Sequence, residues 1–157
     1  LSQFGNNKTY IAVELTTGDV ITPREMKYNY NSIFEDKKIP LLTYTLETVL
    51  AEKFQSVITR GVFNTRQKDF YDIYVLMNFK KNDIDDNNLK QAIYNTFKKR
   101  ETIVDIENIK EVSDILKEDE NMSSLWKSYV SKNPYANGIT FKDTIEALNL
   151  IIDILSK

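Results

Sequence analysis

The side chains best suited to chemistry lie between residues 45 and 76, where two predicted helices follow one another. Lys53 and Arg60 are seven residues apart, almost two helical turns, so both are expected on the buried side of the first helix. Asp69 and Asp72 are three residues apart and share one face of the second helix. Removing charges from water is costly, so these cations and carboxylates need one another or a bound ligand.

Spacing alone leaves two interpretations of this charged group. In the first, the four residues form salt bridges that fix the angle between the helices, and spacing favours this interpretation because structural ion pairs are common. In the second, Lys53 and Arg60 bind an anionic ligand and the carboxylates orient them. The sequence contains no His and no Cys, which excludes imidazole and thiolate catalysis and Cys/His metal sites. The second interpretation therefore favours a phosphate ligand and an oxygen-ligated metal such as Mg²⁺.

Two further positions carry candidate residues. Arg66 and Lys68 lie at the start of the second helix, where backbone N–H groups favour anions, although a solvated basic loop explains them equally well. Glu14 lies between Val13 and Leu15 in a predicted strand. A solvent-facing position explains Glu14 most simply, and a carboxylate at the rim of a magnesium site is the functional alternative.

The elements that position these residues change from strands to helices near residue 45. Alternation and β-branched or aromatic content predict strands over residues 9–15, 24–30 and 39–44. Apolar residues spaced by three and four predict helices over 46–60, 67–79, 85–99 and 106–116, a further one that ends before Asn133-Pro134 and a last one that begins at Thr140. Strands followed by helices predict an α+β fold, with a partial sheet over residues 1–44 and a helical domain over residues 45–157.

Composition restricts the partners and the compartment. With 157 residues, 41% of them apolar, the chain can bury one real core. Lys and Arg (21) nearly balance Asp and Glu (23), so the protein has no strong overall electrostatic field that would attract nucleic acid. No apolar run reaches the length of a membrane span and no signal peptide is visible, so we expect a cytoplasmic protein.

Short motifs extend across the first half of the chain. They are Ile21-Thr-Pro23, Phe34-Glu-Asp36, Leu46-Glu-Thr-Val-Leu-Ala-Glu-Lys53, Arg60-Gly61, Asn64-Thr-Arg66 and Asp69-Phe-Tyr-Asp-Ile-Tyr74. Together they resemble the AbiEii/AbiGii toxin family, the nucleotidyltransferase-like toxins of abortive-infection toxin–antitoxin pairs, a form of phage defence. The resemblance implies that the sheet over residues 1–44 is part of a nucleotidyltransferase-like sheet.

The resemblance also implies roles for individual residues. Lys53 and Asp69 match the lysine and the first aspartate that the family requires for toxicity. Lys53 is then expected to stabilise charge on nucleotide phosphates, and Asp69 to position Lys53 or the acceptor. Glu14 stands where the family's strand normally carries aspartate and is the expected ligand of Mg²⁺. The further candidates for binding nucleotide are Arg60, Arg66 and Asp72.

The family's first motif, a Gly-Ser followed by Asp-x-Asp, does not occur in this sequence. We expect this motif to precede Leu1, so that the chain is the C-terminal part of a toxin. We also expect this part to be inactive alone, because a two-metal site cannot assemble without the carboxylates of the motif. The resemblance implies that the intact protein transfers a nucleotidyl group from an NTP, with GTP among the candidates, to an RNA or protein acceptor. Its expected cofactor is Mg²⁺, and its expected partner is a cognate antitoxin encoded nearby. The alternative is a non-catalytic module whose helices bind an antitoxin or another protein.

Overall fold

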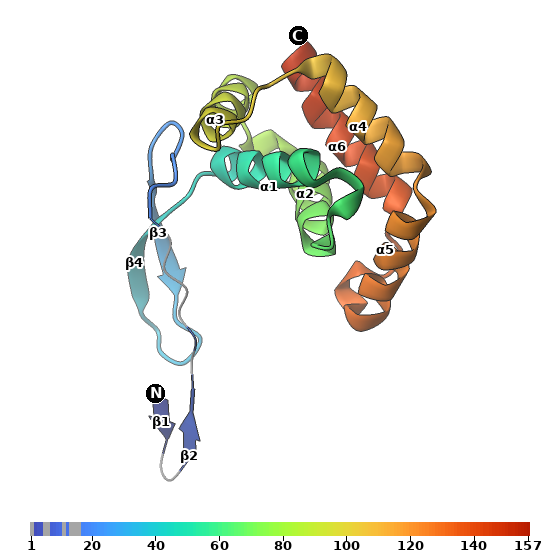
Figure 1. Cartoon of the computed structure of the whole chain (residues 1–157). Coiled ribbons are helices and arrows are strands. Elements are labelled where there is room, and N and C mark those ends of the chain that lie inside the picture. The colour runs from blue at the N-terminus through green and yellow to red at the C-terminus, as the bar shows by residue number, and fades with distance from the viewer. Residues whose placement is uncertain (1, 5–6, 11, 13–16) are drawn as a thin grey trace.

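A computed structural model of the chain describes residues 2–4, 7–10, 12 and 17–157. Strands come first and helices follow (Figure 1). The strands are β1 (Ser2–Phe4), β2 (Asn7–Thr9), β3 (Met26–Asn31) and β4 (Lys38–Thr43). The helices are α1 (Leu46–Arg60), α2 (Gln67–Phe79), α3 (Asp86–Lys99), α4 (Ile106–Glu118), α5 (Glu120–Lys132) and α6 (Phe141–Ser156). The predicted α+β fold is confirmed.

The described strands form two separate antiparallel pairs rather than one sheet. β1 pairs with β2, and β3 pairs with β4 in a register that sets Met26 opposite Thr43 and Pro40 opposite Asn29. β3 and β4 correspond to the strands predicted over residues 24–30 and 39–44. The hairpin that they form extends away from the helices (Figure 1). The strand predicted over residues 9–15 falls mostly outside the described residues, and so does Glu14.

Helix α1 begins and ends where its local sequence predicts. Thr45 is the N-cap, and its hydroxyl accepts a hydrogen bond from the Thr48 N–H at 3.1 Å. Gly61 follows the last helical residue with a φ of 50°, a conformation that costs glycine little. The buried face of α1 carries Leu50 and Phe54. Lys53 comes just before Phe54 and so lies at the edge of this face.

A threonine cluster joins the segment before β3 to the start of α1. The Thr45 hydroxyl donates to the Thr22 carbonyl at 2.6 Å, and the Thr22 N–H donates to the Thr48 hydroxyl at 2.9 Å. Asn95 on α3 donates from Nδ2 to the Thr22 hydroxyl at 2.9 Å. Thr22 is buried, so these bonds are shielded from water. The segment that leads into β3 is therefore attached to α1 and α3.

The core lies between helices that are neighbours in sequence, such as α1 and α2, and helices that are distant, such as α2 and α6. Helix α1 contacts α2 and α3, while α6 contacts α2 and α4. The largest fully buried side chains come from every helix, among them Phe54, Phe70, Leu89, Met122 and Leu148. Packing of this kind allows little relative movement of neighbouring helices. Helices α1 and α2 therefore hold their side chains in a fixed relation.

The later helices agree with their predicted positions. Helix α4 continues two residues past its predicted end, and α5 ends one residue before Asn133-Pro134. Helix α6 opens with a capping box, in which the Asp143 N–H donates to the Thr140 hydroxyl at 3.1 Å and the Thr140 N–H donates to Asp143 Oδ2 at 2.7 Å. Within the described ranges, none of the helices has both the length and the apolar character needed to cross a membrane.

Candidate functional site

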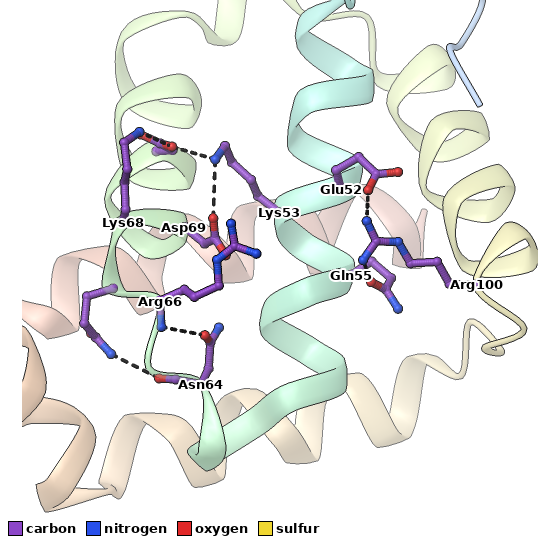
Figure 2. Close-up of polar contacts among 10 residues, drawn as sticks. Glu52, Lys53, Gln55, Asn64, Arg66, Lys68, Asp69 and Arg100 are labelled. Atoms are coloured by element: carbon purple, nitrogen blue, oxygen red, sulfur yellow. Dashed lines mark hydrogen bonds and ion pairs between the residues drawn. The ribbon is translucent and has the colours of Figure 1, made fainter. Parts of the chain in front are cut away.

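Lys53 connects α1 to α2 through two carboxylates. Its Nζ lies 2.6 Å from Asp72 Oδ2 and 3.4 Å from Asp69 Oδ1. Figure 2 shows the Lys53 side chain reaching across from α1 towards Asp69. The Asp69 side chain is only 7% exposed and that of Lys53 is 22% exposed, so solvent screens this contact weakly. The structure thus brings together the lysine and both aspartates that helical spacing placed on facing sides.

Two further cations contact the same carboxylates from the start of α2. Arg66 Nε lies 3.7 Å from Asp69 Oδ2, and Lys68 Nζ lies 2.7 Å from Asp72 Oδ2. Both cations are mostly exposed, in contrast to Lys53. With Lys53 the group contains three cations and two carboxylates, so its net charge is about +1 at neutral pH.

Arg60 does not belong to this group. It is the last residue of α1 and is exposed, and no ion pair involves it within the described part of the chain. Seven residues return a helix almost to the same side but advance it about 10 Å along its axis. Arg60 therefore stands at the end of α1, whereas Lys53 stands near its middle. The prediction that Arg60 shares a buried position with Lys53 is wrong.

The turn that precedes α2 is held by buried amides. Asn64 Oδ1 accepts a hydrogen bond from the Arg66 N–H at 2.9 Å, and Gln67 Nε2 donates to the Asn64 carbonyl at 3.2 Å. The Asn64 Nδ2, Gln67 Oε1 and Asp69 Oδ2 atoms are buried without a hydrogen-bond partner. The 3.7 Å separation of Asp69 Oδ2 from Arg66 Nε is an ion pair but is too long for a hydrogen bond. Buried polar atoms nearly always have partners, so a water or a polar ligand is the expected partner of these three atoms.

A cavity of about 480 Å³ opens beside this charged group. It is lined by Lys53, Thr65, Arg66, Gln67, Lys68, Asp69, Leu125, Ser128, Tyr129, Lys132 and Asn133. Four of these side chains are cationic and one is a carboxylate. Cations gathered in a concave site raise the local concentration of anions. The cavity is therefore suited to an anionic ligand.

A second, smaller cavity of about 230 Å³ shares Lys53, Arg66 and Asp69 with the first. Its remaining lining residues are Tyr44, Val49, Glu52, Ser56 and Arg100. Arg100 forms an ion pair with Glu52 and donates to Gln55 Oε1 at 3.0 Å (Figure 2). Asp69 therefore lies at the boundary of two cavities. Sequence patterns missed Arg100 here, because its place after two lysines at a helix end indicates only a contact with the helix dipole.

The wall that α5 contributes to the larger cavity was also missed. The Tyr129 hydroxyl lies 2.9 Å from the Tyr135 hydroxyl. Burial raises the pKa of Tyr129 well above its usual range, and the hydrogen bond to Tyr135 and the charge of Asp72 add to this effect. The Tyr129 hydroxyl therefore stays protonated at neutral pH. The four-residue spacing of Leu125 and Tyr129 marks one face of α5, but nothing local indicates that this face lies against α2.

Most of the chain matches a known protein family. Residues 2–147 match a family model described as nucleotidyl transferase AbiEii toxin of a type IV toxin–antitoxin system. This chain belongs to the AbiEii family. The resemblance found in its motifs is thereby confirmed, and the chain is a member of a family of nucleotidyltransferase-type toxins. No curated protein and no solved structure matches the AbiEii chain.

The described acids of this AbiEii chain do not form a metal site. Among the residues that the structure describes, there is no group of three or more Asp, Glu, His or Cys residues arranged to hold an ion. Asp69 and Asp72 face Lys53, Arg66 and Lys68 instead, and their charge is already balanced. We therefore assign no Mg²⁺ ligand in this part of the chain. Glu14, the predicted ligand, lies outside the described residues.

Proposed function

We propose that this AbiEii protein binds the phosphates of a nucleoside triphosphate in the larger cavity and takes part in transfer of the nucleotidyl group to an RNA or protein acceptor. The observation that carries the proposal is the position of Lys53. This partly buried ammonium is held by two carboxylates and lines both cavities.

The charge and size of the larger cavity support a triphosphate. Lys53, Arg66, Lys68 and Lys132 line it, and these four cations outnumber the two carboxylates that offset them, Asp69 in the lining and Asp72 paired with Lys53 and Lys68. Its volume of about 480 Å³ lies in the range of ordinary small-molecule sites. The first residues of α2 line it as well, and the N-terminus of a helix adds a positive partial charge.

Lys53 is suited to stabilise charge that develops on phosphate oxygens. An ammonium has three N–H donors, and the two carboxylates of α2 account for two of them. The third is available to a ligand. Because Asp69 and Asp72 already fix the ammonium, it needs little rearrangement when negative charge develops, which is the property that makes such groups effective in catalysis.

Asp69 is suited to position the acceptor. Its Oδ2 atom accepts no hydrogen bond, and the residue lines both cavities. In the proposed reaction the acceptor oxygen attacks the α-phosphorus, the bond from that phosphorus to the bridging oxygen breaks, and pyrophosphate leaves with the electron pair. The acceptor proton passes to solvent or to a neighbouring base. Asp69 would accept a hydrogen bond from the acceptor hydroxyl, which orients it for attack.

Membership of a toxin–antitoxin family supports two further elements of the proposal. A cognate antitoxin is the expected partner, and the nucleotide pool of the cytoplasm is the expected source of the donor. A divalent metal also fits the chemistry of the family.

The test is label transfer by the toxin expressed from its natural reading frame. It is incubated with total RNA and protein and with an NTP labelled at the α- or the γ-phosphate. We expect α-label, and no γ-label, in a macromolecule. The Lys53→Ala variant should lose this transfer, while Lys110→Ala, which alters an exposed lysine of α4, should keep it. Full activity of Lys53→Ala would refute the role of Lys53. Absence of transfer and of nucleotide binding in the wild type, together with tight binding of a partner protein, would favour the non-catalytic interaction module.

A further inference from the structure

We propose that the α5 wall of the larger cavity binds the base of the nucleotide, with Leu125 and Tyr129 as the surface on which the base packs. The inference rests on the proposed function, because it places the base beside the phosphate site formed by α1 and α2. It assigns to the C-terminal helices a direct part in binding the substrate.

The two walls of the cavity differ in chemistry. The wall formed by α1 and the start of α2 contains Lys53, Arg66 and Lys68. The wall formed by α5 and the residue after it contains Leu125, Ser128, Tyr129, Lys132 and Asn133, of which only Lys132 is charged. A nucleotide has the same division, since a polyanionic chain is joined to a flat base with apolar faces. The arrangement of the walls therefore matches phosphates on one side and the base on the other.

Leu125 and Tyr129 form one surface on α5. They are four residues apart, so their side chains are neighbours on the helix. Both are partly buried and both line the cavity, so neither is fully covered by the core. An aliphatic side chain beside an aromatic ring is a surface on which any base can pack through its face.

The Tyr129 ring is held in place before a ligand arrives. Its centroid lies 5.3 Å from that of Trp126 and 6.3 Å from that of Tyr71. The hydroxyl is paired with Tyr135 at 2.9 Å, and Trp126 donates from Nε1 to the Ile139 carbonyl at 3.0 Å. A ring fixed in this way loses little conformational freedom when a base packs on it, which favours affinity.

The α5 wall and the phosphate site are close enough to share one ligand. Helix α5 contacts α2 directly. The ring centroid of Tyr129 lies 6.3 Å from that of Tyr71 on α2, and Tyr71 directly precedes Asp72, the carboxylate that pairs with Lys53 and Lys68. A single nucleotide can therefore contact both walls.

The test compares a ligand that has a base with one that has none. ATP, GTP, CTP, UTP and inorganic triphosphate are each titrated calorimetrically into the wild type, Tyr129→Leu, Tyr129→Phe and the control Tyr94→Leu, which alters a half-exposed tyrosine of α3. We expect Tyr129→Leu to weaken the preferred NTP about ten-fold and to leave inorganic triphosphate unchanged. Tyr129→Phe keeps the ring and should keep the affinity for the NTP. Leu125→Ala should give the same selective loss as Tyr129→Leu, and it replaces that variant if Tyr129→Leu fails to fold.

Each other outcome contradicts the proposal in a different way. An equal loss for the NTP and inorganic triphosphate in both Tyr129→Leu and Leu125→Ala would mean that α5 only supports the fold of the site. Unchanged NTP binding in both variants, or a wild type that binds inorganic triphosphate as tightly as every NTP, would exclude the base subsite and leave the phosphate site standing. A wild type that binds none of the five ligands would overturn the phosphate site and the base subsite together.

Discussion

Lys53 makes its shortest ion pair with Asp72 rather than with Asp69. The Lys53 Nζ lies 2.6 Å from Asp72 Oδ2, and its separation from Asp69 Oδ1 is 3.4 Å. Asp69 also retains an oxygen without a hydrogen bond, Oδ2. Both aspartates hold the ammonium, Asp72 at the shorter distance, and in the proposed function the Oδ2 atom of Asp69 is the acceptor for a ligand.

The Asp72→Asn substitution should separate binding from transfer. The amide holds Lys53 less firmly, so transfer should fall. The loss of one negative charge beside a cationic cavity reduces the repulsion of an anionic ligand. The affinity for inorganic triphosphate should therefore stay unchanged or rise a few-fold, which is less than the about 1.4 kcal/mol of a tenfold change. Label transfer and calorimetry on the same preparation measure the two quantities. A large loss of triphosphate affinity in Asp72→Asn would contradict this separation of binding from transfer.

The Lys68→Ala substitution should affect ligand binding more than folding. Lys68 is 66% exposed, and an exposed i,i+4 ion pair is worth about 0.3–0.5 kcal/mol, so the free energy of unfolding should barely change. The affinity for triphosphate should fall, and the difference from the wild type should shrink as salt rises, since exposed charges are screened. Urea denaturation and titrations at low and high salt measure these effects. A difference that salt does not alter would indicate that Lys68 acts through the structure of α2 instead.

Local sequence was sufficient to predict most of the helical part. Thr45, Gly61 and Thr140 act within one helical turn, so their types indicate where helices begin or end without knowledge of the fold. The contact of Lys53 with the aspartates was also accessible, because α1 and α2 are consecutive and joined by a short turn. The paired strands β1 and β2 were missed, since three residues are too few to show a periodic pattern.

The parts of the site that depend on distant segments were not accessible from sequence patterns. Arg100 and Tyr129 reach the cavities because α3 and α5 pack near α1 and α2, and no spacing along the chain encodes that packing. Arg60 shows the opposite error. Its angular position on the helix suggested a contact with the acids, but its distance along the axis prevents one.

The Thr45→Ala substitution should destabilise the protein more than the Thr140→Ala substitution, which removes an exposed helix cap. Thr45→Ala removes the N-cap of α1 and the hydrogen bond to the Thr22 carbonyl, and both are buried. We expect a loss of about 2 kcal/mol in the free energy of unfolding, against about 1 kcal/mol for Thr140→Ala at the exposed cap of α6. Urea denaturation measures both. Equal losses would mean that the threonine cluster adds nothing beyond capping.

The Tyr129→Phe substitution should reduce the sensitivity of the fold to alkali. Burial raises the pKa of Tyr129 above the ordinary value of 10.0. Below that value the tyrosine is protonated in both the folded and the unfolded state, so its contribution to stability is fully present. As pH rises further, only the unfolded state loses the proton, and the contribution is lost.

The measurement is the melting temperature at about pH 9 and about pH 11, on either side of the ordinary tyrosine pKa. The decrease should be smaller in Tyr129→Phe than in the wild type. Tyr94→Phe, at a half-exposed tyrosine, should behave as the wild type does. An identical decrease in all three proteins would show that Tyr129 does not resist ionisation.

If the ammonium of Lys53 contacts the phosphates of a nucleotide, as we propose, its loss should weaken the binding of inorganic triphosphate, which calorimetric titration measures. The titration is made into the wild type, Lys53→Ala and Lys110→Ala. We predict that Lys53→Ala loses at least about ten-fold in affinity, which corresponds to about 1.4 kcal/mol, while Lys110→Ala binds as the wild type does. Equal affinity of a folded Lys53→Ala protein and the wild type would mean that Lys53 does not contact the phosphates.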